Sequence, residues 1–316
     1  MSVPAVLRLG TRKSPMAMAQ SGLVAEAITA RTGYRVQLIG VTTHGDVSKA
    51  QLAQIGGTGV FVSALRDRLL AGEVDLAVHS LKDLPTGQPE DIILAAVPRR
   101  DDPRDALVTR EGAKLADLAV GAAIGTGSPR RAAQLMLLRK DIRCVPIRGN
   151  ADTRLAKVGT GELDAVVLAA AGLARIGRLD AASQVFEPDD MLPAPGQGAL
   201  AVECRASDPH LADLRSAVDD PLSRAAVTAE RAVLASLEAG CSAPIGAYAA
   251  GTAEHLHLEA AVIAADGGRA LREHGDASPS GAGRLGRDVA ARLQRGGAGS
   301  LMTVPAVRTI NGKDAL

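Results

Sequence analysis

The sequence predicts an α/β protein with two related α/β domains and a smaller α+β third domain that contains an antiparallel sheet. Three observations favour this fold class. Apolar runs of strand length alternate with helical segments up to about residue 200, as in proteins with mostly parallel sheets. Two short motifs recur in the same order in both halves of that region. From about residue 217 the order of the predicted elements changes.

The first half begins with a predicted strand over 6–10. A helix follows it, because Ser14 suits an N-cap and Pro15 suits the first helical position. "YRVQLIGV" is the next strand, and a helix is predicted over 61–71. Further strands are predicted at five apolar runs, "ILAAV", "AAIGT", "CVPIR", "AVVLAA" and "ALAVEC".

The internal repeat consists of two pairs of matching segments. "SPMAMAQ" (14–20) matches "SPRRAAQ" (128–134), and each follows a strand that ends in Gly-Thr. "GEVDLAV" (72–78) matches "GELDAVV" (161–167), and each leads into an apolar strand. Chance could produce either match, but the shared order predicts two related domains.

The repeat also isolates one polar segment, "HSLKD". The first copy continues from its strand into His79, Ser80, Lys82 and Asp83, whereas the second continues with apolar residues over 168–171. The fold therefore does not require these polar side chains, and this favours a functional role over a merely solvated surface. His79, at the end of the strand, is the exception, and we expect it to be structural.

The last third of the sequence has a different pattern. A helix is predicted over 221–239, then two strands at "AYAAG" and "LHLEAAVIA", and an amphipathic helix near 283–295. Strands that precede a helix in this way predict a small α+β domain with an antiparallel sheet.

The composition excludes several classes of protein. The formal net charge is +1, from 36 basic and 35 acidic residues, so we expect no broad surface for nucleic acid or for an anionic membrane. We predict no signal peptide and no membrane span. The three cysteines, Cys144, Cys204 and Cys241, form no CxxC pair, so we expect no disulfide and no metal site, as is typical of the cytoplasm.

Arginines follow several of the predicted strand ends. In the second half these are Arg130, Arg131, Arg148, Arg154 and Arg175, and Arg12 takes a similar place in the first half. Ligands of open α/β sheets bind outside the carboxyl ends of the strands, which predicts an anion site there. Arg130 and Arg131 lie in the first turn of a helix, where cations oppose the helix dipole unless an anion joins them. Their replacement by Leu is therefore expected to damage activity more than stability. The alternative is a set of unrelated surface arginines.

Six segments together resemble the porphobilinogen deaminase (hydroxymethylbilane synthase) family. They are "HSLKDLP", "GTGSPRR", "IRGNADTRL", "AGLARIGR", "LPAPGQGALAVECR" and "EAGCSAPIGAYA", and the resemblance runs from Val6 to about residue 265. It implies two domains that resemble periplasmic binding proteins, and a third domain that carries a cofactor linked to cysteine. It also implies that "ALAVEC" returns to the first domain. The expected domains are thus 1–98 with 199–216, 99–198, and 217–316.

The resemblance further implies a reaction. Four molecules of porphobilinogen, a pyrrole with acetate and propionate side chains, are joined head to tail into a linear tetrapyrrole, and ammonia is lost each time. Asp83 matches the catalytic aspartate of the family. A carboxylate there would stabilise the cation that forms when ammonia leaves, and it could also accept the proton of the attacking pyrrole.

The remaining site residues are carried over from the family in the same way. Cys241 matches the cysteine that holds dipyrromethane through a thioether, and Cys144 and Cys204 are expected to be small core residues. The other expected contacts with the cofactor are Asp46, Lys82, Ser128, Arg130 and Arg131. The expected contacts with the substrate are Arg12, Ser14, Ser80, Arg148, Arg154, Arg175 and Gln197. Family precedent implies a monomer.

The sequence departs from the family at Gln54 and Thr58, where lysines are common. These changes put in doubt a role for that glycine-rich segment in gripping carboxylates. The main alternative function is a cytoplasmic binding protein for a small polycarboxylate, which would not need Asp83 or Cys241. A DNA-binding regulator is disfavoured because the sequence has no helix-turn-helix, and a nucleotide-using enzyme because it has no GxGxxG or P-loop motif.

Overall fold

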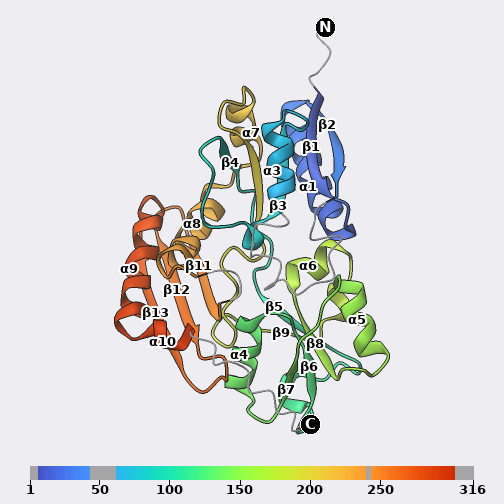
Figure 1. Ribbon diagram of the computed structural model, residues 1–316, viewed down its shortest axis with the longest axis vertical. Helices are drawn as coiled ribbons and strands as arrows, with labels where there is room; N and C mark the ends of the chain where they lie inside the picture. The colour runs from blue at the N-terminus through green and yellow to red at the C-terminus, as the bar shows by residue number, and fades with distance from the viewer. Residues whose placement is uncertain (1–5, 43–61, 240–242, 303–316) are drawn as a thin grey trace, which may run out of the picture.

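The computed structural model describes residues 6–42, 62–239 and 243–302 of the chain. Within these ranges the protein forms two five-stranded sheets and one three-stranded sheet, with helices packed against them (Figure 1). The first sheet lies at the top of Figure 1, the second at the lower right and the third at the left. The predicted α/β class, with two related sheets and a third antiparallel one, is confirmed.

The first sheet has the strand order β2-β1-β3-β10-β4. Its strands are β1 (Val6–Arg12), β2 (Arg35–Val41), β3 (Leu76–Ser80), β4 (Ile92–Ala96) and β10 (Leu200–Arg205). The helices around it are α1 (Pro15–Thr32), α3 (Ser63–Leu70) and α7 (Leu211–Val218). Ser14 is the N-cap of α1, as predicted, because its Oγ accepts a hydrogen bond from the backbone N of Ala17 at 3.3 Å.

The second sheet has the order β7-β6-β8-β5-β9. Its strands are β5 (Asp105–Thr109), β6 (Ala123–Gly125), β7 (Arg143–Val145), β8 (Ala165–Ala169) and β9 (Gln184–Val185). Its helices are α4 (Pro129–Leu138), α5 (Ala151–Gly159) and α6 (Ala170–Arg175), with the 3-10 turns η2 (Leu115–Asp117) and η3 (Leu179–Ala181). Ser128 caps α4 as Ser14 caps α1, since its Oγ accepts from the backbone N of Arg131 at 3.4 Å.

The second motif of the repeat has the same structural role in both sheets. In the first sheet the Asp75 carboxylate accepts a hydrogen bond from the backbone N of Arg8 at 2.8 Å. In the second, Asp164 accepts one from the backbone N of Ala123 at 2.7 Å. Each bond joins the strand before the serine-capped helix, β1 or β6, to the segment that leads into the neighbouring strand, β3 or β8. The glycine that begins each motif has a positive φ, 68° and 78°. These repeated residues therefore maintain the fold.

The expectation of mostly parallel sheets is wrong, because each of the two larger sheets is mixed. β1 runs parallel to β2 and β3, but β10 runs antiparallel to β3 and β4. In the same way β6 is parallel to β7 and β8, but β5 is antiparallel to β8 and β9. The antiparallel strands β5 and β10 are those at which the chain enters a sheet from the other one. β5 was not predicted, because its apolar run is short and directly follows the polar segment "RRDDPR".

The third sheet is antiparallel, with the order β11-β12-β13. Its strands are β11 (Ile245–Gly251), β12 (Leu256–Ile263) and β13 (Ala270–Ala277), and its helices are α8 (Pro221–Ser236), α9 (Ala282–Arg295) and α10 (Ala298–Met302), with the turn η4 (Pro279–Gly281). β13 was not predicted, because it is an edge strand in which exposed polar residues alternate with half-buried ones. Its core joins α8 and α9 to β11 and β12.

Two linkers, 97–104 and 186–199, connect the first and second sheets and touch each other. The backbone N of Asp101 donates a hydrogen bond to the carbonyl oxygen of Gly198 at 3.3 Å. Gly198 has a φ of 85°, and a Cβ there would lie 2.6 Å from the carbonyl oxygen of Asp101. Only glycine permits this close approach.

One buried carboxylate ties both linkers to the third sheet. Glu230 of α8 is fully buried and pairs with Arg100 of the first linker, with 2.5 Å between Arg100 Nη1 and Oε1. It also accepts hydrogen bonds from the backbone N of Gly196 at 2.6 Å and from that of Ala249 in β11 at 2.8 Å. The carboxylate oxygens of Glu230 are thus hydrogen-bonded by the first linker, the second linker and β11.

We propose that each sheet marks one domain, with the boundaries expected from the sequence: 1–98 with 199–216, 99–198, and 217–316. The pairing of β10 with β3 and β4, and the separate cores of the three sheets, support this division. None of the helices in the described part of the chain combines the length and apolar character needed to cross a membrane.

Candidate functional site

Asp83 lies on a short turn at the end of β3. The strand ends at Ser80, and the 3-10 helix η1 (Leu81–Asp83) follows it. Arg231 of α8, a helix packed on the third sheet, holds this turn, since its guanidinium donates to the carbonyl oxygens of Leu84 at 2.8 Å and of Pro85 at 2.6 Å. The Asp83 side chain is exposed, so a fixed backbone presents a free-standing carboxylate to solvent.

His79, the other titratable residue of this segment, points into the protein. It is 7% exposed, and its Nε2 lies 3.3 Å from Oε2 of Glu203 in β10. Arg66 of α3 donates to both oxygens of the same carboxylate, at 3.0 and 2.8 Å. Burial would raise the pKa of Glu203, but the contacts with His79 and Arg66 outweigh it and lower the pKa to about 2. This arrangement agrees with the structural role expected for His79.

Arg130 and Arg131, in the first turn of α4, are both buried against one carboxylate. Arg130 Nη1 lies 2.7 Å from Oδ2 of Asp105, and Arg131 Nη2 lies 2.7 Å from Oδ1. The arginines also donate to the carbonyl oxygens of Leu192 and Val167, at 2.6 and 3.0 Å. Burial alone would raise the pKa of Asp105, but the two guanidinium charges outweigh it and hold the pKa well below its usual range.

The anion that joins the two arginines is therefore part of the protein. The expectation that Leu at these positions would damage activity more than stability changes accordingly, because removing Arg130 or Arg131 leaves Asp105 short of a partner in the interior. Asp105 was missed because it begins the unpredicted strand β5. The signal available in the sequence was an acid at the head of the apolar run "ALV", since a buried carboxylate requires a cationic partner.

Gln197 connects this arginine pair to the turn that carries Asp83. Its Oε1 accepts hydrogen bonds from Lys82 Nζ at 3.2 Å and from Arg131 Nη2 at 3.4 Å. Its Nε2 donates to Asp105 Oδ1 at 2.8 Å and to the carbonyl oxygen of Pro103 at 2.7 Å. Burial and the charge of Arg131 lower the pKa of the half-buried Lys82 to about 8.

The remaining predicted arginines occupy different surroundings. Arg154 of α5 is half-buried and donates to the carbonyl oxygen of Gly149 at 2.9 Å; burial and the nearby charge of Arg131 lower its pKa. Arg175 is bound to the linkers instead, 2.8 Å from the Asp101 carboxylate and 2.6 Å from the carbonyl oxygen of Gly198, with 5% of its side chain exposed.

The other predicted contacts lie at or beyond the ends of strands. Arg148 is exposed on the loop between β7 and α5, and Arg12, Ser14, Ser80 and Ser128 are half-buried at the ends of β1, β3 and β6. The structure thus brings together Lys82, Gln197, Arg130 and Arg131 around the unpredicted Asp105, with Arg154 near Arg131. The roles of the predicted contacts remain predictions.

Asp46 and Cys241, together with the departures at Gln54 and Thr58, lie outside the described residues. The two cysteines that are described, Cys144 and Cys204, are free thiols. Burial raises the pKa of both to about 11, so at neutral pH neither is a good nucleophile.

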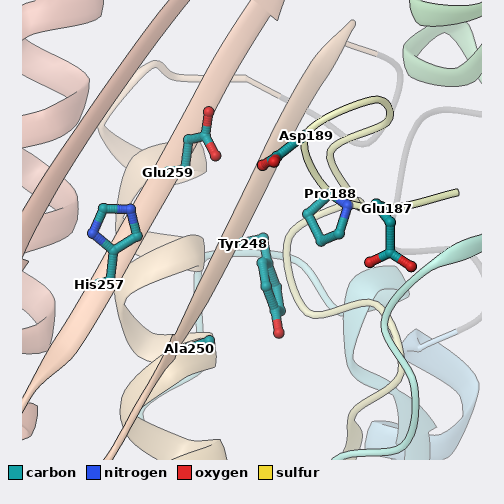
Figure 2. Close-up of a pocket in the computed structure, with 7 residues that line it drawn as sticks. All are labelled: Glu187, Pro188, Asp189, Tyr248, Ala250, His257 and Glu259. Carbon is teal, nitrogen blue, oxygen red and sulfur yellow. The ribbon is translucent and has the colours of Figure 1, made fainter.

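A cavity of about 310 Å³ lies between the third sheet and the linker after β9 (Figure 2). It is lined by Glu187, Pro188, Asp189, Tyr248, Ala250, His257 and Glu259, none of which is a predicted site residue. Two of its carboxylates already have cationic partners: Glu187 lies 2.5 Å from Arg104 and Glu259 lies 2.8 Å from Arg272. Over the described ranges, no group of side chains is arranged to hold a metal ion.

Comparison with known proteins assigns the chain to a family. The family model "porphobilinogen deaminase, dipyromethane cofactor binding domain" matches residues 7–213, and the model "porphobilinogen deaminase, C-terminal domain" matches residues 224–295. The chain is 65% identical over 268 residues to the porphobilinogen deaminase of Thermobifida fusca, covering 84% of this chain and 83% of the relative. It is 54% identical over 310 residues to porphobilinogen deaminase 1 of Streptomyces coelicolor, covering 94% and 97%.

Among solved structures, a periplasmic substrate-binding protein of an ABC transporter from Coxiella burnetii aligns with a TM-score of 0.44 and 17% identity. The alignment covers 67% of this chain and 91% of that chain. The two family models span both of the larger sheets and most of the third part of the chain. The chain belongs to the porphobilinogen deaminase family.

Proposed function

We propose that this chain is a transferase that deaminates four molecules of porphobilinogen and condenses them head to tail into hydroxymethylbilane, in tetrapyrrole biosynthesis. The observation that carries the proposal is the exposed carboxylate of Asp83 next to Lys82, which the Gln197 network connects to Arg131. The substrate has two carboxylates and develops a positive charge during the reaction. Its site therefore needs cationic side chains for the carboxylates and an anionic side chain for the positive charge.

Asp83 would stabilise the positive charge and accept the proton that the condensation produces. Loss of ammonia from the protonated aminomethyl group leaves a cation delocalised onto the pyrrole nitrogen, and a carboxylate fixed beside that nitrogen stabilises it. The terminal pyrrole of the bound chain attacks this cation through its free α-carbon and must then lose the α-proton, which the same carboxylate can accept. The turn held by Arg231 keeps the carboxylate in place, so little reorganisation is needed.

The cationic cluster would bind carboxylates. Dipyrromethane, two linked pyrroles, has four carboxylates, and as the primer it would supply the terminal pyrrole on which the chain grows. The residues present fit such a group, because cations exceed acids in this cluster: Lys82, Arg130, Arg131 and, near Arg131, Arg154 against Asp83 and Asp105. Arg12, Ser14, Ser80 and Arg148 at neighbouring strand ends, and Arg175 at the end of α6, would contact the added units, and Ser128 and Asp46 the primer.

We further propose that the primer is attached through a thioether to Cys241 and that the protein acts as a cytoplasmic monomer without a nucleic-acid or membrane partner. The raised pKa values of Cys144 and Cys204 support this choice among the three cysteines. The balanced formal charge of +1 supports the absence of a polyanionic partner.

An intact-mass measurement tests the proposal. Protein purified from a host that makes porphobilinogen is expected to be heavier than its sequence by two linked pyrrole units, and peptide mapping is expected to place them on Cys241. Added porphobilinogen should then increase the mass stepwise, one pyrrole at a time. Cys241→Ser should remove the extra mass entirely, whereas the matched control Cys144→Ser should retain it.

Two results would contradict the proposal. A protein at its bare sequence mass that gains no pyrrole units from added porphobilinogen would point to the alternative, a binding protein for a small polycarboxylate. An adduct that maps to Cys144 or Cys204 would leave the enzymatic function standing but would overturn the attachment at Cys241.

A further inference from the structure

We propose that Gln197 is a positioning residue, which holds Lys82 beside Asp83 by joining it to Arg131 and Asp105, and that it makes no contact with substrate. This inference rests on the proposed function, and it replaces the substrate contact expected for Gln197 from the sequence. It concerns a residue whose side chain has no exposed surface, although it lies within hydrogen-bond distance of Lys82.

The hydrogen bonds of Gln197 leave its amide no capacity for a ligand. Both N–H groups are used, one by Asp105 Oδ1 at 2.8 Å and one by the carbonyl oxygen of Pro103 at 2.7 Å. Its Oε1 receives Lys82 at 3.2 Å and Arg131 at 3.4 Å, and an amide oxygen has two lone pairs. A substrate carboxylate could reach this amide only by breaking the link between the first and second sheets.

The backbone around Gln197 is built for this position. Gly196 and Gly198 flank it with φ values of 77° and 85°, which only glycine adopts readily. A Cβ at Gly196 would lie 2.3 Å from a methyl carbon of Leu81, so the loop packs directly on the turn η1. The side chain between the two glycines thereby lies between Lys82 of η1 and Asp105 of β5.

The charges around Lys82 explain why an acceptor is needed there. Arg131 and Arg130 of α4 disfavour its protonated form, whereas Asp83 of η1 and Asp105 of β5 favour it, and burial opposes it. With a pKa of about 8, the ammonium is only moderately favoured at neutral pH. A neutral acceptor such as the Gln197 oxygen stabilises the ammonium without adding a negative charge that would pair with Arg131 instead.

The test compares the holoenzyme with the variant Gln197→Met, which keeps the length of the side chain but removes both hydrogen-bonding groups. Loss of the acceptor should lower the pKa of Lys82 by about one unit. Because Lys82 would bind a carboxylate as its ammonium, kcat should fall as Lys82 loses its proton, and this alkaline limb of the kcat profile should move to lower pH by the same amount. The protonation of Lys82 is followed independently by competitive acetylation with acetic anhydride across pH, with Lys82 quantified by peptide mass spectrometry.

The chain offers a matched control in Gln134→Met. Gln134 of α4 is also buried, and in the described part of the chain its amide bonds only backbone groups, those of Leu192 in the same linker at 2.8 and 3.1 Å and the carbonyl oxygen of Arg130 at 3.4 Å. This variant should lose stability comparably while the Lys82 titration and the alkaline limb stay where they are. If Gln197→Met does not fold, Gln197→Asn takes its place, because the shorter side chain keeps the amide but moves it away from Lys82. This variant should lower the pKa of Lys82 by a smaller amount.

The outcomes separate this inference from the proposed function. A shift in the Gln197 variant alone supports the positioning role, and no shift in an active variant overturns it. An equal shift in both variants also overturns it, because general loosening would then be the cause. The protein could lack deaminase activity altogether while the pH dependence of Lys82 acetylation shifts only in the Gln197 variant. In that case the proposed function fails and the link between Gln197 and Lys82 stands.

Discussion

Replacing Asp83 by Asn is expected to lower kcat by a factor of about 10² or more, the scale for removing one preorganised electrostatic group. The amide has the same shape and can still form hydrogen bonds, but it has no negative charge to place beside the cation and no basic oxygen to accept the pyrrole proton. Stability should hardly change, because the side chain is exposed and the equivalent strand end of the second sheet lacks it. Steady-state kinetics with porphobilinogen and thermal unfolding measure the two effects.

A matched control for this variant exists in the second domain. Asp117 is likewise exposed and is likewise the last residue of a 3-10 helix that begins with a buried leucine. Asp117→Asn should therefore leave kcat within twofold of the parent, since ordinary surface substitutions have small effects (about 0.5 kcal/mol or less). Near-normal turnover of Asp83→Asn would remove the electrostatic role from the mechanism.

The second large effect is expected for Arg131→Leu, which should lower the free energy of unfolding by about 3 kcal/mol. Asp105 keeps Arg130 and Gln197, but it loses one of the two cations that make its burial tolerable. Arg148→Leu is the matched control, because that arginine is exposed; it should change stability by about 0.5 kcal/mol or less while weakening turnover. Urea unfolding of the three proteins at pH 7 gives the comparison.

The stability difference between the parent and Arg131→Leu should depend on pH through the pKa of Asp105. The pKa of Asp105 is depressed in the folded protein, so its pairing contributes stability above the unfolded pKa of about 4. This contribution is lost as the pH falls from about 4 toward the folded pKa, where the carboxyl takes up a proton. The difference between the parent and Arg131→Leu should therefore be constant from pH 7 to 5 and shrink below pH 4. Equal stability of Arg131→Leu and Arg148→Leu at pH 7 would show that the buried pair contributes nothing.

Sequence reasoning located the polar ends of the strands because local signals determine them. Ser14 and Ser128 are N-caps whose role depends on a few neighbouring residues, and the repeat separated the structural Asp75 from the exposed Asp83. The class of the third domain also followed from the local order of elements. These features need no knowledge of which segments meet in space.

The parts that were missed depend on contacts between distant segments. Asp105 meets Arg130 and Arg131 only because β5 lies beside β8 in the second sheet. Glu203 meets Arg66 only because β10 joins the first sheet next to β3. No pattern within a short stretch of sequence indicates such partners. The presence of a charged residue in a buried strand was visible, but the identity of its counter-charge was not.

The position of β10 has a consequence for how this protein is made. On the ribosome, β3 and β4 emerge long before Leu200, so the first sheet has a gap between them while the entire second sheet is synthesised. At about 5–20 residues per second this takes several seconds or more. During that time both strands present unpaired N–H and C=O groups along their edges. The nascent chain is therefore expected to depend on chaperones until β10 closes the gap, and a truncation before Leu200 should yield a protein that aggregates through these two edges.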